Sequence, residues 1–208
     1  MTAEPRSSLA RLHRRRRSPA WLFFRRFLAH PLRLASVLES SSALSRLVAA
    51  ELACDPGDYV PRDYVVELGA GTGPVTRALL AAGVPPERLI AVEIDSEMAD
   101  FLRQSLPGVT VIESDALALE QALPREALGR VGAVVCGLPV SLLPAAQRRE
   151  LIGGMLSLLP PGRPFLAYTH RLTSPLPAAE LGLEGERRAF TLLNLPPASV
   201  WAFRPLSG

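Results

Sequence analysis

Glu67 and three glycines form the segment of this chain with the clearest chemical potential. Residues 65–76 read VVELGAGTGPVT, with Gly69, Gly71 and Gly73 in G-x-G-x-G spacing directly after the acidic residue. Glycines carry no Cβ, so the backbone can approach a ligand closely. A dinucleotide-binding loop has G-x-G-x-x-G spacing instead, and a carboxylate at this point would repel a pyrophosphate. The segment therefore favours a ligand with a cationic amino-acid group.

Two further acidic residues follow at the ends of the next two expected strands. Glu93 stands in AVEID and Asp115 in VIESDAL. A carboxylate at the end of the second strand can accept hydrogen bonds from both hydroxyls of a ribose. One at the end of the third strand can meet an adenine amino group. Each acid alone could equally be a solvated strand end or a helix cap, but three in this order predict an adenosine-bearing ligand with an ammonium group.

An alternation of apolar strands and helices must position these acids. From residue 63 on, we expect the segments YVVEL, TGPVTRALLAAG, RLIAVEI, SEMADFLRQSL, VTVIES, GAVVCGL, PAAQRRELIGGMLSLL and RPFLAYTH to be strand and helix in turn, with a short helical stretch before GAVVCGL. A helix over residues 36–53 is expected to precede them. Such alternation predicts an α/β fold with a mostly parallel sheet covered on both faces. The chain closes with two expected strands, RRAFTLLNL and SVWAFR, which predict an antiparallel hairpin at one edge.

The acids and glycines together resemble the class I S-adenosylmethionine-dependent methyltransferases. The matching stretches are E-x-G-x-G-T-G, V-E-x-D and S-D-A, and the resemblance extends over residues 36–204. It implies a Rossmann-like fold with a seven-stranded sheet and S-adenosyl-L-methionine as cofactor, with S-adenosyl-L-homocysteine as product. It also implies that Glu67 and the glycine loop take the methionine portion, Glu93 the ribose and Asp115 the adenine, with Ile94 and Ala116 on the adenine faces.

The end of the fourth expected strand bears on the methyl acceptor. It reads VVCGLPVSLLP, where relatives that methylate adenine or glutamine nitrogens have (D/N)-P-P-Y or N-L-P-Y. Gly137 replaces the polar residue of that motif and Val140 replaces its aromatic residue. The loop lacks both the hydrogen-bonding side chain and the stacking ring, which argues against an adenine acceptor.

Four stretches resemble bacterial phospholipid N-methyltransferases: SSSALSR, RALLAAGVPPERLIAVE, the GLP above and NLPPASVWAFR. The resemblance implies stepwise methylation of phosphatidylethanolamine towards phosphatidylcholine, and it brings Ser40 and Ser41 beside the cofactor. Glu39 departs from the proline that this family often has. The full set of cofactor-binding residues expected is Ser40, Ser41, Glu67, Gly69, Gly71, Thr72, Gly73, Glu93, Ile94, Asp115, Ala116, Gly137 and Leu138.

Tyr168 and His170 are the candidate catalytic residues. They alternate in LAYTH at the end of the fifth expected strand, so they are expected on one face at the catalytic edge. An ethanolamine amine has a pKa near 10 in water and must lose a proton before it attacks a methyl group. Either residue could orient the amine, and the ring of Tyr168 or Trp201 could attract a methylated cation. Asn194 is a weaker candidate for accepting a hydrogen bond from the amine.

The first 33 residues differ in charge from the remainder. They hold nine arginines and one acidic residue, which gives +8, whereas the other 14 arginines and 19 acidic residues give −5. We expect a basic arm over residues 1–33 and a methyltransferase domain over residues 34–208. Within the arm, residues 18–30 are expected to form a short amphipathic helix that docks on an anionic membrane. Its membrane-binding residues are expected to be Trp21, Phe24, Arg25, Arg26, Phe27 and Leu28. The alternative is that this apolar arc packs on the body of the protein.

Composition excludes several classes. The 23 basic residues are all arginine, so no catalytic lysine is available, and no apolar run is long enough to span a membrane. Two cysteines, Cys54 and Cys136, make neither a disulfide framework nor a zinc site. We therefore expect a cytoplasmic enzyme bound peripherally to the inner membrane face, with a phospholipid substrate, no metal and no nucleic-acid partner. The alternatives are an RNA adenine N6-methyltransferase, for which the basic arm would hold phosphate, and a non-catalytic cofactor- or lipid-binding module.

Overall fold

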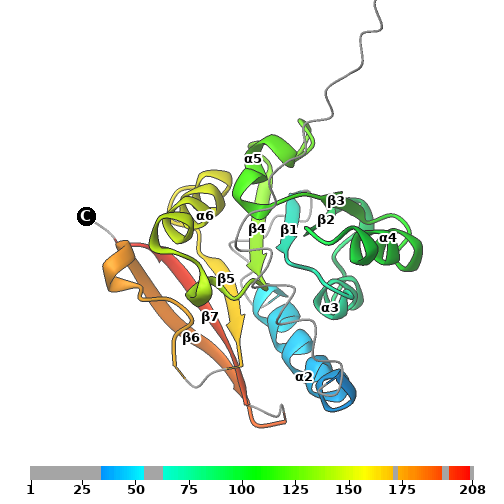
Figure 1. Ribbon diagram of the computed structural model, residues 1–208, viewed down its shortest axis with the longest axis horizontal. Coiled ribbons are helices and arrows are strands. Elements are labelled where there is room, and N and C mark those ends of the chain that lie inside the picture. The colour runs from blue at the N-terminus through cyan, green and yellow to red at the C-terminus, as the bar shows by residue number, and fades with distance from the viewer. Residues whose placement is uncertain (1–33, 54–62, 171–172, 194–196, 207–208) are drawn as a thin grey trace, which may run out of the picture. The chain divides into compact units, whose positions relative to one another are not determined.

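The computed structural model describes residues 34–53, 63–170, 173–193 and 197–206. The expected basic arm with its amphipathic helix, Cys54 and Asn194 lie outside these residues. The described residues form an α/β fold, as expected from the sequence (Figure 1).

A seven-stranded sheet runs through the described part of the chain in the order β3-β2-β1-β4-β5-β7-β6. Strands β1 to β5 are parallel, and β7 pairs antiparallel with both β5 and β6. The mostly parallel sheet with an antiparallel edge pair is therefore confirmed. The strands are β1 (Tyr64–Leu68), β2 (Leu89–Glu93), β3 (Thr110–Glu113), β4 (Val131–Cys136), β5 (Phe165–Thr169), β6 (Leu183–Thr191) and β7 (Ala198–Pro205).

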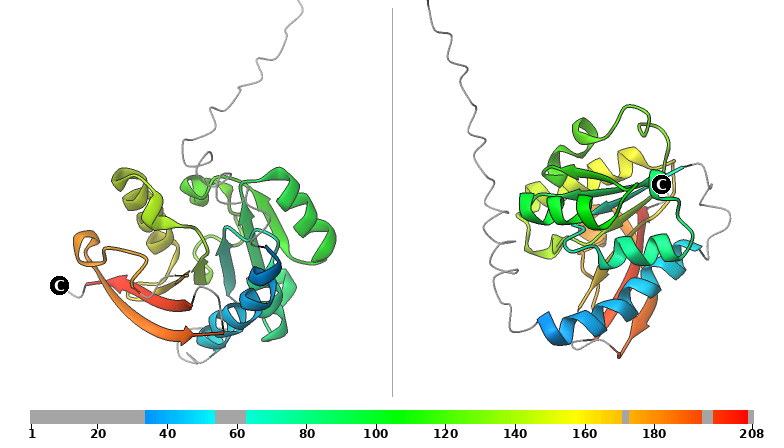
Figure 2. Two further views of the ribbon diagram at one scale, coloured as in Figure 1. Left: turned by 60° about the horizontal axis from the view of Figure 1, so that its bottom comes forward. Right: turned by 90° about the vertical axis from the view of Figure 1, so that its right-hand side faces the viewer.

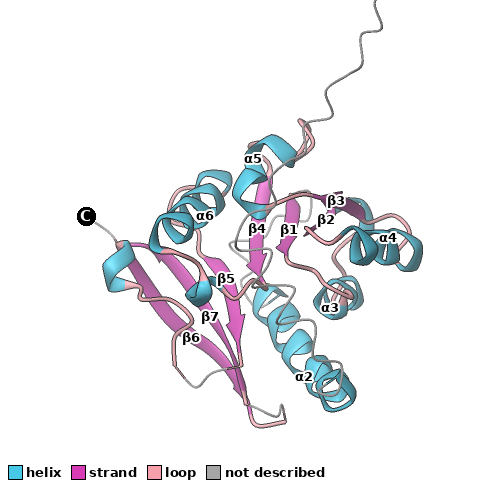
Figure 3. Cartoon of the chain, in the orientation of Figure 1, coloured by secondary structure: helices cyan, strands magenta, loops and turns pink. Residues whose placement is uncertain are grey.

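Helices cover both faces of the sheet, as Figures 2 and 3 show. On one face, α2 and α3 pack on side chains of β1, β4, β5 and β7, and α4 packs beside α3 on β2. On the other face, α6 and residues around α5 close a second apolar cluster. The α-helices are α2 (Leu34–Ala53), α3 (Pro74–Ala81), α4 (Ser96–Ser105), α5 (Leu119–Ala122) and α6 (Ala145–Leu158), and the short 3-10 helices are η2 (Pro86–Arg88), η3 (Ala116–Ala118), η4 (Val140–Leu142) and η5 (Ala179–Leu181).

The central strands are buried on both faces, which explains why they read as continuous apolar runs. All five residues of β1 and all five of β2 are buried, Glu67 and Glu93 among them. Neighbouring residues of a strand face opposite sides, so Val66 packs towards α6 while Val65 packs towards α2 and α3. Most of the expected elements agree with the structure to within about two residues at each end.

The edge strand β6 is the main correction to the predicted elements. The sequence predicted a strand over RRAFTLLNL, but β6 covers Leu183–Thr191 and ends before Leu192 and Leu193. Its first six residues, LEGERR, are mostly exposed and carry charges, as suits a strand that pairs on one side only. The apolar residues Leu192 and Leu193 instead follow the strand and are 74% and 81% exposed.

The carboxyl ends of the parallel strands define one edge of the sheet. After β3 the chain crosses back, so that β4 lies on the opposite side of β1 from β2. Such a reversal of strand order is the place where open α/β sheets bind ligands. The acids expected to bind the cofactor and the β4–η4 loop all lie at this edge.

Candidate active site

The loop between β1 and α3 is shaped by three glycines with positive φ. Gly69, Gly71 and Gly73 have φ of 72°, 58° and 81°, a region that other residues rarely enter. A Cβ on Gly69 would come within 2.6 Å of Leu138, and one on Gly73 within 2.8 Å of Leu102. A Cβ on Gly71 would meet nothing within 4 Å. The first and third glycines thus allow the protein to pack on itself, whereas the second faces open space where a ligand can approach.

Glu67 is a buried carboxyl with one oxygen unused. Its Oε2 accepts a 2.6 Å hydrogen bond from the hydroxyl of Thr76 on α3. Its Oε1 is buried and has no partner among the described residues. Burial, reinforced by the nearby Glu93 carboxylate, raises the pKa of Glu67 to about 8. An unpaired buried carboxyl oxygen of this kind suits a cationic hydrogen-bond donor, which would favour the ionised form of Glu67.

The shifted pKa of Glu67 predicts how the stability of the ligand-free protein depends on pH. The folded-state pKa of Glu67 lies above the ordinary value of 4.5. The stabilising contribution of the protonated carboxyl group to folding is therefore fully present below pH 4.5. This contribution is lost as the pH rises from about 4.5 to about 8, by at most about 1.4 kcal/mol per pH unit. Urea unfolding of wild type and Glu67→Gln across this range should give curves that converge at low pH and separate as the pH rises. A constant difference between the two proteins would show that Glu67 does not titrate in this window.

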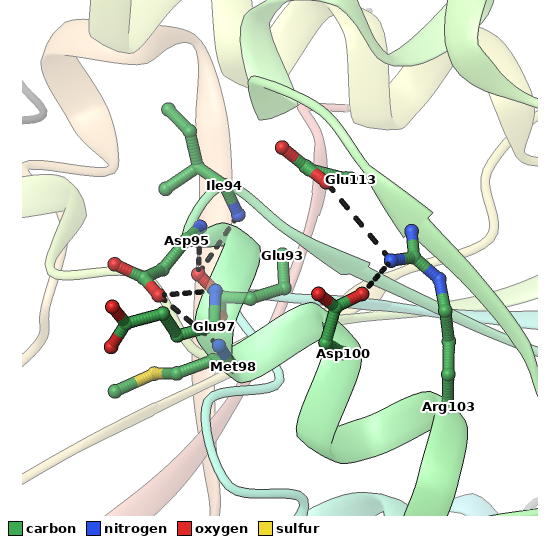
Figure 4. Close-up of polar contacts among 8 residues, drawn as sticks. All are labelled: Glu93, Ile94, Asp95, Glu97, Met98, Asp100, Arg103 and Glu113. Carbon is green, nitrogen blue, oxygen red and sulfur yellow. Dashed lines mark hydrogen bonds and ion pairs between the residues drawn. The ribbon is translucent and has the colours of Figure 1, made fainter.

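Glu93 holds the glycine loop and the start of α4 together. Its Oε1 accepts hydrogen bonds from the backbone N–H groups of Ile94 (2.8 Å) and Asp95 (2.9 Å), as Figure 4 shows. Its Oε2 accepts one from the N–H of Gly71 at 2.8 Å. The side chain is only 1% exposed. A carboxylate has about four lone-pair sites, so acceptor capacity remains for a ligand's hydroxyl groups.

Asp95 caps α4, a feature that the sequence interpretation missed. Its carboxylate accepts hydrogen bonds from the N–H groups of Glu97 (3.0 Å) and Met98 (3.1 Å) (Figure 4). An aspartate directly before a helical segment is a recognisable capping signal. On the same helix Arg103 pairs with Asp100 at 2.7 Å. These contacts fix the helix that follows Glu93.

The third strand ends in a second capping carboxylate. Asp115 accepts a hydrogen bond from the N–H of Leu117 at 3.0 Å and so caps η3. Asp115, Ala116 and Ile94 are all partly buried. Thr72 is exposed, and its carbonyl accepts a hydrogen bond from Arg77 at 2.6 Å. The edge formed by the carboxyl ends of the parallel strands thus brings together the acidic residues and adjacent residues that the sequence predicted for the cofactor site. Asp115 also caps a helix, which was the alternative role considered for each acidic residue.

Gly137 and Leu138 bring the β4 loop against the glycine loop. The N–H of Gly137 donates to the carbonyl of Leu68 at 2.8 Å. The side chain of Leu138 lies against Gly69, where a Cβ would otherwise stand. Ser40 and Ser41 lie within α2, and their side chains are outside those described.

Tyr168 lies on the face of the sheet that carries Glu67 and Gly137. Its hydroxyl lies directly against Gly137, where a Cβ would collide with it. Burial and the negative charges of Glu67, Cys136 and Glu93 raise the pKa of Tyr168 well above its usual range, so the hydroxyl stays protonated. His170 is the first residue after β5 and is partly buried.

Trp201 is not on the same face as Tyr168. It pairs in register with Ala167, packs beside Phe203 and donates its indole N–H to Ser199 at 2.9 Å. Because neighbouring positions of a strand face opposite sides, the rings of Tyr168 and Trp201 lie on opposite faces of the sheet and remain separate candidates for attracting a methylated cation.

The remaining cysteine in the described residues is inert. Cys136 is fully buried, and burial raises the pKa of its thiol to about 12. In the described ranges no group of three His, Cys, Asp or Glu side chains is placed to hold a metal ion. Across those same ranges, no helix has the length and apolar character needed to cross a membrane.

Comparison with known proteins identifies the family. Residues 65–162 match the methyltransferase domain family. The chain is 30% identical over 187 residues to an ornithine lipid N-methyltransferase of Singulisphaera acidiphila, which covers 88% of this chain and 95% of that protein. The chain belongs to the class I S-adenosylmethionine-dependent methyltransferases.

Other similarities are narrower or concern the fold alone. A ribosomal RNA small subunit methyltransferase A of Prosthecochloris aestuarii is 45% identical over 62 residues, which are 30% of this chain and 23% of that protein. Magnesium protoporphyrin IX methyltransferase from Synechocystis PCC 6803, solved with bound S-adenosylmethionine, has a TM-score of 0.61 at 17% identity and covers 90% of this chain and 92% of its own. That likeness shows the shared fold.

The cofactor of this methyltransferase is S-adenosylmethionine. The residues at the carboxyl edge fit it chemically. The unpartnered buried Oε1 of Glu67 suits the ammonium of its methionine portion, and the open space above Gly71 leaves room for a ligand along the loop. The structure therefore presents both a charge partner and an unobstructed backbone where the cofactor needs them.

Proposed function

We propose that this methyltransferase transfers methyl groups from S-adenosylmethionine to the amine of a membrane lipid. The observation that carries the proposal is the end-to-end similarity to the ornithine lipid N-methyltransferase, which covers 95% of that protein. Similarity of that extent includes the acceptor side of the site as well as the cofactor loop.

Two head groups are candidates. Phosphatidylethanolamine and its mono- and dimethyl derivatives, leading to phosphatidylcholine, are supported by the resemblance of the β4 loop and hairpin sequence to phospholipid N-methyltransferases. Ornithine lipid is supported by the named relative. Both offer an aliphatic amine, which is the chemistry that the site has to recognise.

We assign the cofactor contacts residue by residue. Glu67 receives the ammonium, Glu93 the two ribose hydroxyls and Asp115 the adenine amino group. Ile94 and Ala116 flank the adenine, with the remaining contacts from the glycine loop with Thr72, from Gly137 and Leu138, and from Ser40 and Ser41. When bound, the cofactor supplies an electrophilic methyl group on a positively charged sulfur and leaves as S-adenosyl-L-homocysteine.

The protein's own task is to prepare the acceptor amine. A protonated amine has no free lone pair, so a proton must leave before the N–C bond can form while the C–S bond breaks. Desolvation at the site lowers the pKa of the ammonium. Tyr168, which stays protonated, is suited to positioning the amine and not to removing its proton. His170 is our candidate for accepting that proton, directly or through water.

A peripheral association with the inner face of the cytoplasmic membrane follows from a lipid substrate. The arm over residues 1–33, with Trp21, Phe24, Phe27 and Leu28 on its apolar side, remains our proposed anchor. Basic residues such as Arg25 and Arg26 near an anionic surface contribute about 1 kcal/mol each. The domain boundary at residue 33 is part of this proposal.

Within the described residues, Leu192 and Leu193 support contact with lipid. They follow β6 at the edge where the parallel strands end, because Thr191 pairs with Ala198 and Thr169 with Ser199. Both are largely exposed. Exposed leucines beside an active-site edge are suited to entering a lipid surface.

Replacing both leucines by serine should weaken activity on vesicles. We expect the apparent KM for vesicle-borne lipid to rise about tenfold, since each leucine contributes up to about 1.5 kcal/mol on burial. Activity on the same lipid dispersed in detergent should stay near that of wild type. Leu128→Ser is the matched control, because Leu128 is 40% exposed in the loop before β4, at the opposite edge. Equal KM values for the two variants would exclude a lipid contact by the hairpin.

One assay tests the proposed function against its alternatives. The full chain is incubated with methyl-labelled S-adenosylmethionine and either vesicles of phosphatidylethanolamine with anionic lipid, vesicles of ornithine lipid, or ribosomal RNA. We expect label in the lipid fraction of one or both vesicles. Label in RNA alone would favour the RNA methyltransferase alternative, which the short match to a ribosomal RNA enzyme motivates. Label nowhere, with cofactor bound, would favour a non-catalytic module.

The β4 loop argues against RNA. Gly137 provides no hydrogen-bonding side chain. Val140 is aliphatic and 2% exposed within the core, so it offers no aromatic ring on which a base could stack. A planar base would find neither contact at this loop.

A further inference from the structure

Gly137 and Tyr168 are fitted to one another. Cys136 pairs in register with Ala167, which places Gly137, the first residue after β4, beside Tyr168 of β5. A Cβ at position 137 would collide with the tyrosine hydroxyl. The same Cβ would lie 3.0 Å from the tyrosine Cζ and 3.2 Å from the carbonyl oxygen of Gly69. The hydroxyl therefore occupies the volume that any side chain at position 137 would need.

Backbone conformation does not explain the glycine. Gly137 is absent from the glycines with positive φ, so an alanine there would meet no backbone strain. The closest obstacle to a side chain is the Tyr168 hydroxyl. The absence of a side chain at position 137 is thus tied to the presence of this hydroxyl group.

The Tyr168 hydroxyl lies in a polar part of the site. The carboxyl groups of Glu67 and Glu93 both act electrostatically on Tyr168. Glu67 faces the same side of the sheet, as its hydrogen bond to Thr76 on α3 shows. Among the described residues the hydroxyl is influenced by burial and by charge and not by a hydrogen bond, so its oxygen can act as an acceptor.

We propose that Gly137 and Tyr168 together form the binding position of the acceptor amine, which we call the seat. In it, the missing side chain of Gly137 leaves room for the hydroxyl of Tyr168. The hydroxyl oxygen accepts an N–H of the amine and orients its lone pair. This inference rests on the proposed function and adds its specificity: the seat takes an aliphatic amine that still carries an N–H.

The seat predicts a different role at each methylation. A neutral primary amine has two N–H groups and a monomethyl amine has one, so both can donate to the hydroxyl. A neutral dimethyl amine has none. Loss of the hydroxyl should therefore slow the first two methyl transfers and affect the third much less.

The test compares Tyr168→Phe, Gly137→Ala and the double variant on three acceptors. Anionic phosphatidylglycerol vesicles carry phosphatidylethanolamine, its monomethyl form or its dimethyl form, and the same series is made with ornithine lipid and its N-methylated forms. We expect Tyr168→Phe to lower kcat about tenfold to a hundredfold on the first two acceptors, the effect of one hydrogen bond to a polar amine. On the dimethyl acceptor kcat should fall less than about threefold, and S-adenosylmethionine affinity by calorimetry should stay close to that of wild type.

Gly137→Ala separates the seat from a merely structural tyrosine. It should displace the hydroxyl and lower the same two steps as Tyr168→Phe does. The double variant should be close to Tyr168→Phe alone, because the hydroxyl that clashes is gone and the new methyl group meets only the tight contacts to Cζ at 3.0 Å and to the Gly69 carbonyl oxygen at 3.2 Å. Equal losses on all three acceptors, additive effects in the double variant, or full activity of Tyr168→Phe would each overturn the inference while leaving the proposed function intact. A wild type that methylates no lipid in either series contradicts the proposed function, and the inference with it.

Discussion

Replacing Gly71 by leucine is expected to reduce S-adenosylmethionine binding by at least about a hundredfold while the domain still folds. Nothing lies within 4 Å of the position where a Cβ would stand, so the side chain would project into the open space that we assign to the cofactor. The positive φ of 58° adds a backbone cost of about 1–2 kcal/mol. Calorimetric titration with S-adenosylmethionine measures the affinity, and urea unfolding measures the stability.

Gly129→Leu is the matched control for this variant. Gly129 has a φ of 72° and open space around it, but it lies in the loop before β4, at the opposite edge of the sheet. It should lose a similar amount of stability and bind the cofactor as wild type does. If Gly71→Leu also binds normally, the cofactor does not pass over this part of the loop.

Glu93→Ala is expected to lower both cofactor affinity and stability. The carboxylate accepts three backbone hydrogen bonds, including the one from Gly71 that holds the glycine loop. Removing it leaves these N–H groups without their acceptor and removes the proposed ribose contact. We expect affinity to fall about a hundredfold, or about 3 kcal/mol, and the free energy of unfolding to fall by about 1–3 kcal/mol.

Glu113→Ala provides the comparison on the next strand. Glu113 pairs in register with Glu93 at the end of β3, but its side chain is exposed and its contact to Arg103 is 4.0 Å long. Losing it should change both quantities little, as for a surface ion pair. Indistinguishable behaviour of the two alanine variants would remove Glu93 from the cofactor site.

Much of the fold was predictable because the central strands are short, apolar and separated by helices with clear periodicity. The segment YVVEL was predicted as a strand and is β1. Glu67 and Glu93 could be recognised because an acidic residue at the end of a buried strand is costly to bury unless it binds a partner or a ligand. The edge strand β6 was placed too late because its exposed residues lack an alternating pattern, and the apolar Leu192 and Leu193 were mistaken for strand.

The contacts that complete the site could not be predicted from the sequence. The bond from Gly71 to Glu93 joins residues 22 positions apart, and it depends on how the loop after β1 folds over β2. The fit of Tyr168 against Gly137 depends on the register of β4 and β5. The sequence showed that the motif lacks a polar side chain at position 137, and the structure shows which group occupies that volume.

The most direct test of the proposed function is tandem mass spectrometry of lipid after incubation with the full chain and S-adenosylmethionine. Vesicles of phosphatidylethanolamine and of ornithine lipid, each with phosphatidylglycerol, are extracted and their head-group and acyl fragments compared. We predict that the head-group fragment of at least one lipid gains the mass of one or more CH₂ units, and that the acyl fragments are unchanged. A mass gain confined to the acyl chains, or no gain in either lipid while S-adenosylmethionine binds, would contradict the assignment of this protein as a lipid-amine methyltransferase.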